Sequence, residues 1–160
     1  MRAGEALVDE AERESLDRHF LVYPILFTYR HALELAIKWT IEQYGGYVGV
    51  YLDYNDRDHD LWKLWKLCKR VIIELGGDGS GDEGLTAVEQ IVTDFHNIDK
   101  NGTAFRYPTN KNGTTIMLPG TAIDLLNIQR VMEGVDNFFN GTDGLLHETS
   151  ANSEFPEPDW

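Results

Sequence analysis

The chain has 160 residues, a hydrophobic fraction of 42% and a formal net charge of -13. This length suits one hydrophobic core rather than two, and no stretch approaches the roughly 20 apolar residues that a membrane-spanning helix needs. The acidity excludes nucleic-acid binding over the whole surface, because phosphate contacts need Lys and Arg. A single cysteine excludes an internal disulfide. Since the first twenty residues also lack the apolar run of a secretory signal, we expect a cytoplasmic protein with no membrane segment.

The first 46 residues predict two helices. Residues 4–19 favour helix but have a weak apolar stripe, so we expect residues 1–20 to form a peripheral first helix. A longer apolar stripe at helical spacing covers residues 22–44. Pro24 would lie in the first turn of this second helix, where a missing N–H costs little. The pair Gly45-Gly46 is a typical stop signal.

The next segment predicts a third helix with a marked start. Residues 47–60 are ambiguous and fit either a short extended piece or a long loop. Asp60 is a plausible N-cap for a helix over residues 61–75. Cys68 lies within the apolar stripe of that helix, which favours a small buried side chain over a reactive thiol.

The second half of the chain predicts two more helices with a hairpin between them. Apolar residues at helical spacing indicate a fourth helix that ends near Ile98. Residues 101–118 have strand-like ends around Asn112-Gly113, a pattern typical of a small β-hairpin. Thr121 and Asp124 have the spacing of a capping-box variant at the start of the last helix.

These elements predict one domain of the all-α class. We expect an up-and-down bundle of four to five helices over residues 1–141, with the hairpin inserted before the last helix. Gly141 is expected to end that helix. Residues 142–160 then form an acidic, loosely ordered tail.

Polar residues on the second helix are the first candidates for a site. Arg30 and Glu34 are four residues apart and can pair along the helix surface. His31 lies next to Arg30 but away from the main apolar stripe. The pair fits either a structural salt bridge or a groove at a dimer seam, because apolar residues on two sides of this helix indicate two packing partners.

Further candidates surround the third and fourth helices. His59 and Asp60 precede the third helix, where a cap beside a solvent-exposed histidine is the simplest interpretation. His96 and Asp99 lie on one flank of the fourth helix, and a carboxylate there can fix the tautomer of an imidazole. The spacing of these residues matches no metal-ligand motif, so we expect no metal or other cofactor.

A local basic segment contrasts with the acidic average. The stretch WKLWKLCKR interleaves aromatic residues with cations. Such a face can follow a phosphate backbone, although solvated helix faces often carry the same pattern. The candidate phosphate contacts are Lys63, Lys66, Lys69 and Arg70.

Three stretches, PILFTYRHALELAIKW, HDLWKLW and IDKNGTAFRYP, occur in this order and together resemble bacterial members of the HEPN superfamily. HEPN stands for higher eukaryotes and prokaryotes nucleotide-binding domain. The resemblance covers roughly residues 21–140. It implies an all-α bundle that forms a homodimer, and many members are metal-independent RNases of toxin–antitoxin and phage-defence systems.

The family's RNase motif is missing where the resemblance requires it. That motif is an Arg and a His separated by four to six residues near the start of the late helix. After Asn110 the only arginine is Arg130 and the only histidine is His147. Arg13 and His19 fit the spacing but belong to the wrong helix.

We therefore expect a non-catalytic HEPN-like module that binds nucleic acid (RNA is one possibility), a nucleotide or a protein partner. Arg106 in its FRYP context is the first residue we expect in the site, together with Arg30, Glu34, His59 and Asp99. A tether from the hairpin to a helix is the alternative role of Arg106. Two other functions stay open: an RNase with an unorthodox Arg/His set, and a purely protein-binding partner or inhibitor.

Overall fold

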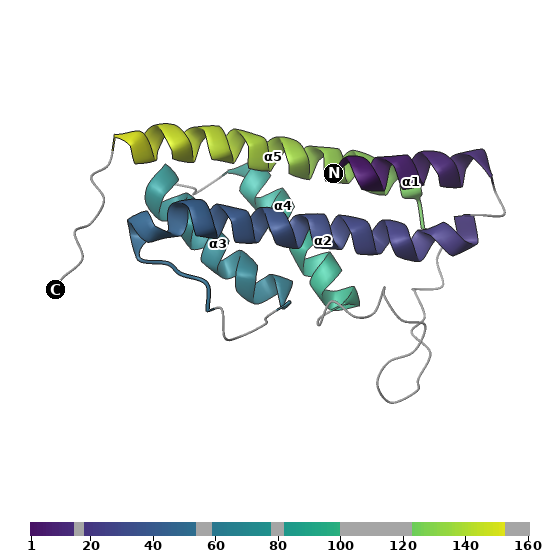
Figure 1. The fold of residues 1–160 in the computed structure, drawn as a ribbon, viewed down its shortest axis with the longest axis horizontal. Helices are drawn as coiled ribbons and strands as arrows, with labels where there is room; N and C mark the ends of the chain where they lie inside the picture. The colour runs from purple at the N-terminus through teal and green to yellow at the C-terminus, as the bar shows by residue number, and fades with distance from the viewer. Residues whose placement is uncertain (15–17, 54–58, 78–81, 100–122, 153–160) are drawn as a thin grey trace, which may run out of the picture.

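The computed structural model describes residues 1–14, 18–53, 59–77, 82–99 and 123–152. These residues form five α-helices and one 3₁₀ helix, and none of them lies in a β-strand. In Figure 1, α1 and α5 run along the upper side of the long helix α2, while α3 and α4 cross the view obliquely. The all-α class is therefore confirmed, and the hairpin predicted for residues 101–118 lies outside the described residues. The elements are α1 (Arg2–Arg13), α2 (Arg18–Tyr44), η1 (Gly45–Val48), α3 (Leu61–Gly76), α4 (Glu83–Ile98) and α5 (Leu125–Ala151).

The boundary between the first two helices differs from the prediction. Helix α1 ends at Arg13 and α2 already begins at Arg18, so Pro24 lies inside α2 rather than in its first turn. A proline inside a helix removes one backbone hydrogen bond. The adjacent Ile25 and Leu26 are buried, and this packing offsets the loss.

Helix α1 packs closely on α2 through small residues. Its buried positions are Gly4, Val8 and Ala11. A Cβ at Gly4 would overlap the ring of Tyr29, so glycine allows the two helices to approach at this point. The sequence did not predict this contact, because the apolar stripe was defined by large apolar residues and glycine is not one of them.

Aspartate caps begin the last three helices. The Asp60 carboxylate accepts hydrogen bonds from the backbone N–H groups of Trp62 and Lys63 at 3.0 and 3.2 Å, which confirms the predicted cap. Asp82 caps α4 in the same way. Asp124 is itself the N-cap of α5, since it accepts from the N–H of Asn127. The predicted capping box, which placed Asp124 inside the helix, is therefore wrong.

Helix α5 continues ten residues beyond its predicted end. It passes through Gly141 and ends at Ala151, so residues 142–151 belong to the helical domain rather than to a loosely ordered tail. Thr142, Leu146 and Ser150 recur every four residues and are all buried. Their burial outweighs the roughly 1 kcal/mol that a glycine costs inside a helix. Residues 153–160 lie outside the described residues.

One hydrophobic core unites all five helices. Among its most buried members are Tyr29, Ile37, Trp65, Val92 and Leu125. Cys68 is also fully buried, and burial raises the pKa of its thiol to about 12, as expected for a structural cysteine. No helix in the described part of the chain has the length and hydropathy that a membrane span requires.

Candidate functional site

Arg30 lies inside the bundle, where it connects three parts of the chain. Only 1% of the residue is exposed. Its Nε donates to the backbone oxygen of Asp99 at 3.2 Å, and its Nη2 donates to the backbone oxygen of His59 at 2.7 Å. Its Nη1 donates to Glu34 Oε2 at 3.1 Å. One guanidinium therefore ties α2 to the residue before the α3 cap and to the end of α4.

The buried carboxylate of Glu34 contacts three side chains, each of them positively charged or polar. Besides Arg30, Lys38 Nζ lies 2.7 Å from Oε1 and His59 Nδ1 lies 2.8 Å from the same oxygen. Burial opposes the ionised form, but the hydrogen bonds from Lys38 and His59 outweigh it. The pKa of Glu34 is therefore lowered from its ordinary value.

A second carboxylate–histidine contact lies beside the first. His96 Nδ1 on α4 is 3.2 Å from Oδ1 of Asp60, although this contact is not aligned as a hydrogen bond. The structure thus brings together six of the residues that the sequence singled out. We call this cluster the polar junction: Arg30, Glu34, His59, Asp60, His96 and Asp99.

The polar junction is chiefly a structural brace. Arg30, Glu34 and Asp99 are buried, and the guanidinium lies 3.1 Å from the carboxylate of Glu34 and 3.5 Å from that of Asp99. The side chain of His59 is 43% exposed, and its Nδ1 is held by Glu34. A carboxylate that fixes one ring nitrogen leaves the other available to solvent, as a general base requires. The described residues contain no group of three or more His, Cys, Asp or Glu that could hold a metal ion.

One described site residue that the sequence predicted is not part of this cluster. His31 follows Arg30 in the sequence, but its ring stacks on Phe27 with a centroid distance of 5.8 Å and an interplanar angle of 4°. One residue along a helix turns the side chain by about 100°, which separates His31 from the junction. Arg106 lies outside the described residues.

The basic face of α3 has fewer available charges than its sequence indicates. Lys69 Nζ lies 2.6 Å from Glu89 Oε2 on α4, so this lysine bridges two helices. Arg70 makes two hydrogen bonds to Glu74, at 2.7 and 3.3 Å. Lys63 and Lys66 are exposed. Because Lys69 and Arg70 are paired with carboxylates, this face is a poor match for a phosphate backbone.

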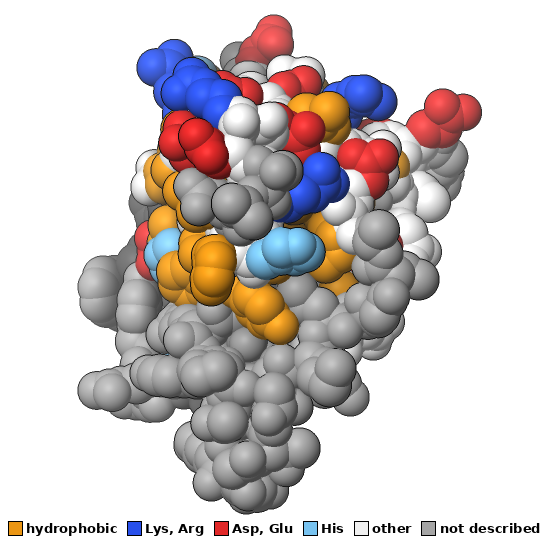
Figure 2. Space-filling model, turned by 90° about the vertical axis from the view of Figure 1, so that its right-hand side faces the viewer, with side chains coloured by type: hydrophobic (Ala, Val, Ile, Leu, Met, Phe, Trp, Pro, Cys, Tyr) orange, Lys and Arg blue, Asp and Glu red, His pale blue; other side chains and the backbone are white. Residues whose placement is uncertain are grey.

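The end of the bundle where α2 begins has a mixed surface. Figure 2 shows charged side chains at the top of this view, and hydrophobic and histidine side chains together below them. Arg18 helps to organise this end, because it donates to the backbone oxygen of Ile123 at 3.0 Å and pairs with Glu12 at 3.2 Å. Phe20 is largely exposed.

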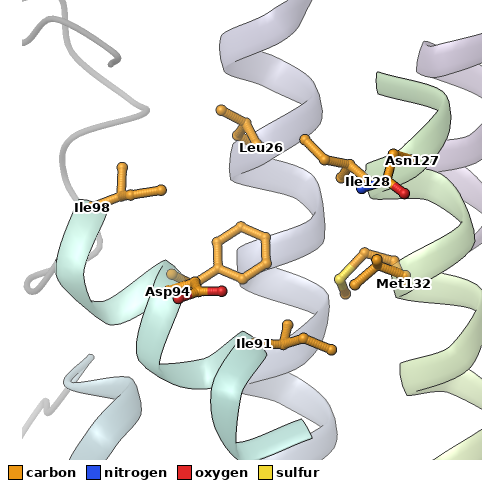
Figure 3. Close-up of a pocket in the computed structure, with 9 residues that line it drawn as sticks. Leu26, Ile91, Asp94, Ile98, Asn127, Ile128 and Met132 are labelled. Carbon is orange, nitrogen blue, oxygen red and sulfur yellow. The ribbon is translucent and has the colours of Figure 1, made fainter. Parts of the chain in front are cut away.

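An apolar groove between α4 and α5 escaped the sequence analysis. Figure 3 shows one part of it, where Leu26 of α2 lies between Ile98 on α4 and Ile128 on α5. This part has a volume of about 220 Å³. A second hollow of about 270 Å³ shares Ile91 and Val131 with it, so the two are continuous. We call this surface the α4–α5 groove.

The sequence did contain a signal for the groove. Ile98 and Val131 are exposed and line the groove, and each extends an apolar stripe beyond the width that one core contact needs. Asp94 lines the groove on α4, and Arg130 lines it on α5. Neither makes an ion pair with another described residue.

No protein-family model, curated protein or solved structure matches this chain. The HEPN resemblance therefore stays a prediction that rests on the three sequence stretches.

Proposed function

We propose that this protein is a non-catalytic, HEPN-like up-and-down helical module that binds another protein chain through the α4–α5 groove. The partner that fits best is a second copy of the same chain. The observation that carries this proposal is a continuous apolar groove whose α4 side presents Asp94 and whose α5 side presents Arg130. The proposal includes the cytoplasmic location and the toxin–antitoxin or phage-defence context that the resemblance implies.

The charges of the groove are self-complementary. In a two-fold dimer the same patch is used by both subunits, so each contact between two different residues occurs twice. Asp94 of one protomer can then face Arg130 of its partner, and the reverse pair forms at the symmetric position. The apolar residues between them, including Ile91 and Val131, would supply the burial that drives association.

Nucleic acid fits these surfaces less well. The groove is mostly apolar and carries one carboxylate and one guanidinium. On α3, Lys69 and Arg70 are already paired with carboxylates. The formal charge of -13 would further repel a polyanion.

The polar junction supports a non-catalytic assignment. Cleavage of RNA without a metal needs a cation that stabilises the charge developing on the phosphate. Arg30 is buried and directs three N–H groups at protein acceptors, so it cannot approach a substrate. No cofactor is part of the proposal.

Charge reversal tests the dimer directly. Sedimentation equilibrium should give a dimer for the wild type. Asp94→Arg and Arg130→Asp should each weaken it by about tenfold or more, because both favourable pairs of the symmetric dimer become like-charge contacts. The double variant D94R/R130D restores opposite charges and should recover most of the affinity. Val131→Asp should abolish association, while Leu145→Asp, at another exposed position of α5, should leave it unchanged.

A wild-type chain that stays monomeric at all concentrations would exclude the second copy as partner. If none of the three groove substitutions weakens the dimer, the interface lies elsewhere on the chain.

An RNase is the second candidate, because Glu34 holds His59 in the orientation of a general base. Incubation with total RNA, with and without EDTA, tests it beside a His31/His59/His96 triple-alanine variant. We expect intact RNA in every sample. Cleavage that resists EDTA and disappears in the triple variant would establish the enzyme instead.

A further inference from the structure

A hollow on the other side of α5 has a composition distinct from that of the α4–α5 groove. It lies between α2 and α5 and has a volume of about 320 Å³. Its lining combines two aromatic rings, Trp39 and Phe139, with two carboxylates, Asp136 and Asp143. We call this hollow the Trp39 pocket.

Helical spacing places these side chains together. On α5, Asp136, Phe139 and Asp143 are separated by three and four residues, so they share one face of the helix. Trp39 comes from α2 and is 45% exposed. The ring of Tyr44 contacts Trp39 edge to face, with a centroid distance of 6.0 Å and an interplanar angle of 83°. This contact holds the indole in place before any ligand binds.

The electrostatics of the pocket favour a positive ligand. Of the described residues, two carboxylates and no Lys or Arg line the pocket. Asp143 accepts a hydrogen bond from the hydroxyl of Tyr44, which fixes its orientation. Asp136 makes no ion pair with any residue in the described part of the chain. An anion would be repelled, and a neutral apolar ligand would leave the carboxylates without a counter-charge.

The nearest lysine in the sequence does not occupy the pocket. Lys38 precedes Trp39, but its ammonium group lies 2.7 Å from Glu34 in the polar junction. The pocket therefore has two aromatic walls and two carboxylates, while the neighbouring cation, Lys38, pairs with Glu34 instead. Aromatic faces attract cations, and the combination of aromatic rings with carboxylates is how proteins bind substituted ammonium groups.

We propose that the Trp39 pocket binds an organic cation, either an alkylammonium or a guanidinium group. This inference is independent of the proposed function, since the pocket opens between α2 and α5 and not along the α4–α5 groove. The cation can be a free small molecule or a Lys or Arg side chain of another protein. The pocket chemistry is the same in both cases.

Matched pairs of probes test the charge requirement. Choline is compared with 3,3-dimethyl-1-butanol, which has the same shape without the charge. Nα-acetyl-lysine-N-methylamide is compared with its norleucine analogue, and Nα-acetyl-arginine-N-methylamide with its citrulline analogue. Binding is followed by NMR shifts of the Trp39 indole N–H in the full chain. We expect saturable shifts with the cations and none with the neutral probes.

Substitutions locate the site. Trp39→Leu keeps an apolar side chain but removes the aromatic face, and Asp136→Asn removes one charge at an exposed position. Binding to the Leu variant is followed through the backbone amide shifts of α5, and each substitution should weaken the cation by about fivefold or more. Trp39→Phe should retain part of the affinity, and Glu148→Gln, an exposed carboxylate elsewhere on α5, should have no effect.

The outcomes separate the possible ligands. Saturation by choline alone identifies a small-molecule site, while saturation by the lysine or arginine probe identifies a site for a protein side chain. The proposal is wrong if the neutral probes bind as tightly as the cations. It is equally wrong if Asp136→Asn leaves the affinity unchanged, or if no cation shifts the pocket signals up to about 10 mM, the weakest binding such a site should show.

Discussion

Replacing Arg30 by methionine tests whether the polar junction is a brace or an exposed site. The substitution keeps an apolar side chain of similar length and removes the three hydrogen bonds to Glu34, His59 and Asp99. Breaking a buried ion pair from one side costs about 3–5 kcal/mol, because the remaining charge stays buried. Glu34 keeps its contacts with Lys38 and His59, so we expect the lower end, about 3 kcal/mol.

Urea unfolding followed by circular dichroism measures this loss, and a melting curve should show a decrease of about 6–12 °C. The chain contains a matched control, since Arg70 and Glu74 form the same ion pair at the same spacing on the surface of α3. Arg70→Met should leave the unfolding midpoint close to that of the wild type, because solvent screens exposed pairs. An Arg30→Met variant as stable as Arg70→Met would refute the brace and make Arg30 available for a ligand.

Three further predictions address pH, thiol reactivity and the course of α5. Because the pKa of Glu34 is lowered in the folded state, its ionised form stabilises the fold above its ordinary value of 4.5, and this contribution is lost as the pH falls through the folded pKa. The difference in unfolding free energy between wild type and Glu34→Gln should therefore be constant at neutral pH and shrink in acid; an unchanged difference at pH 3 would contradict the assignment. Cys68, with a pKa of about 12, should react with a disulfide reagent only at the rate of unfolding, and fast labelling of the native protein would show that the thiol is accessible. Gly141→Ala should stabilise the protein by about 0.5–1 kcal/mol, because alanine favours helix and its Cβ would meet no atom within 4 Å. Gly49→Ala should destabilise the protein, because Gly49 has a φ of 65°. If urea unfolding shows that Gly141→Ala lowers the unfolding free energy and Gly49→Ala raises it, the helix boundaries are wrong.

The adjacency of Arg30 and His31 shows how two neighbouring residues acquire different roles. Arg30 points into the bundle and His31 stacks on Phe27, although both belong to the same turn of α2. Both residues belong to the first of the three stretches that resemble the HEPN superfamily. The turn of about 100° per residue already places the two side chains on different faces of α2, and the hydrogen bonds of Arg30 to Glu34, His59 and Asp99 give it the structural role.

The sequence by itself determined the features that depend on neighbouring residues. Apolar residues at helical spacing predicted α2, α3 and α4, and Asp60 predicted the start of α3. Each of these signals acts within one or two helical turns. The burial of Cys68 followed for the same reason, because its position in the stripe of α3 already faced the core.

Only the tertiary structure decided the features that depend on distant partners. Helix α5 continues past Gly141 because Leu146 is buried in the common core. Arg30 is buried rather than on the helix surface, because the backbone oxygens of His59 and Asp99, 29 and 69 residues away in the sequence, complete its hydrogen bonds. The α4–α5 groove exists because these two consecutive helices leave a gap between their apolar sides. Local spacing can specify the face of one helix, but the partner of that face is set by packing across the whole chain.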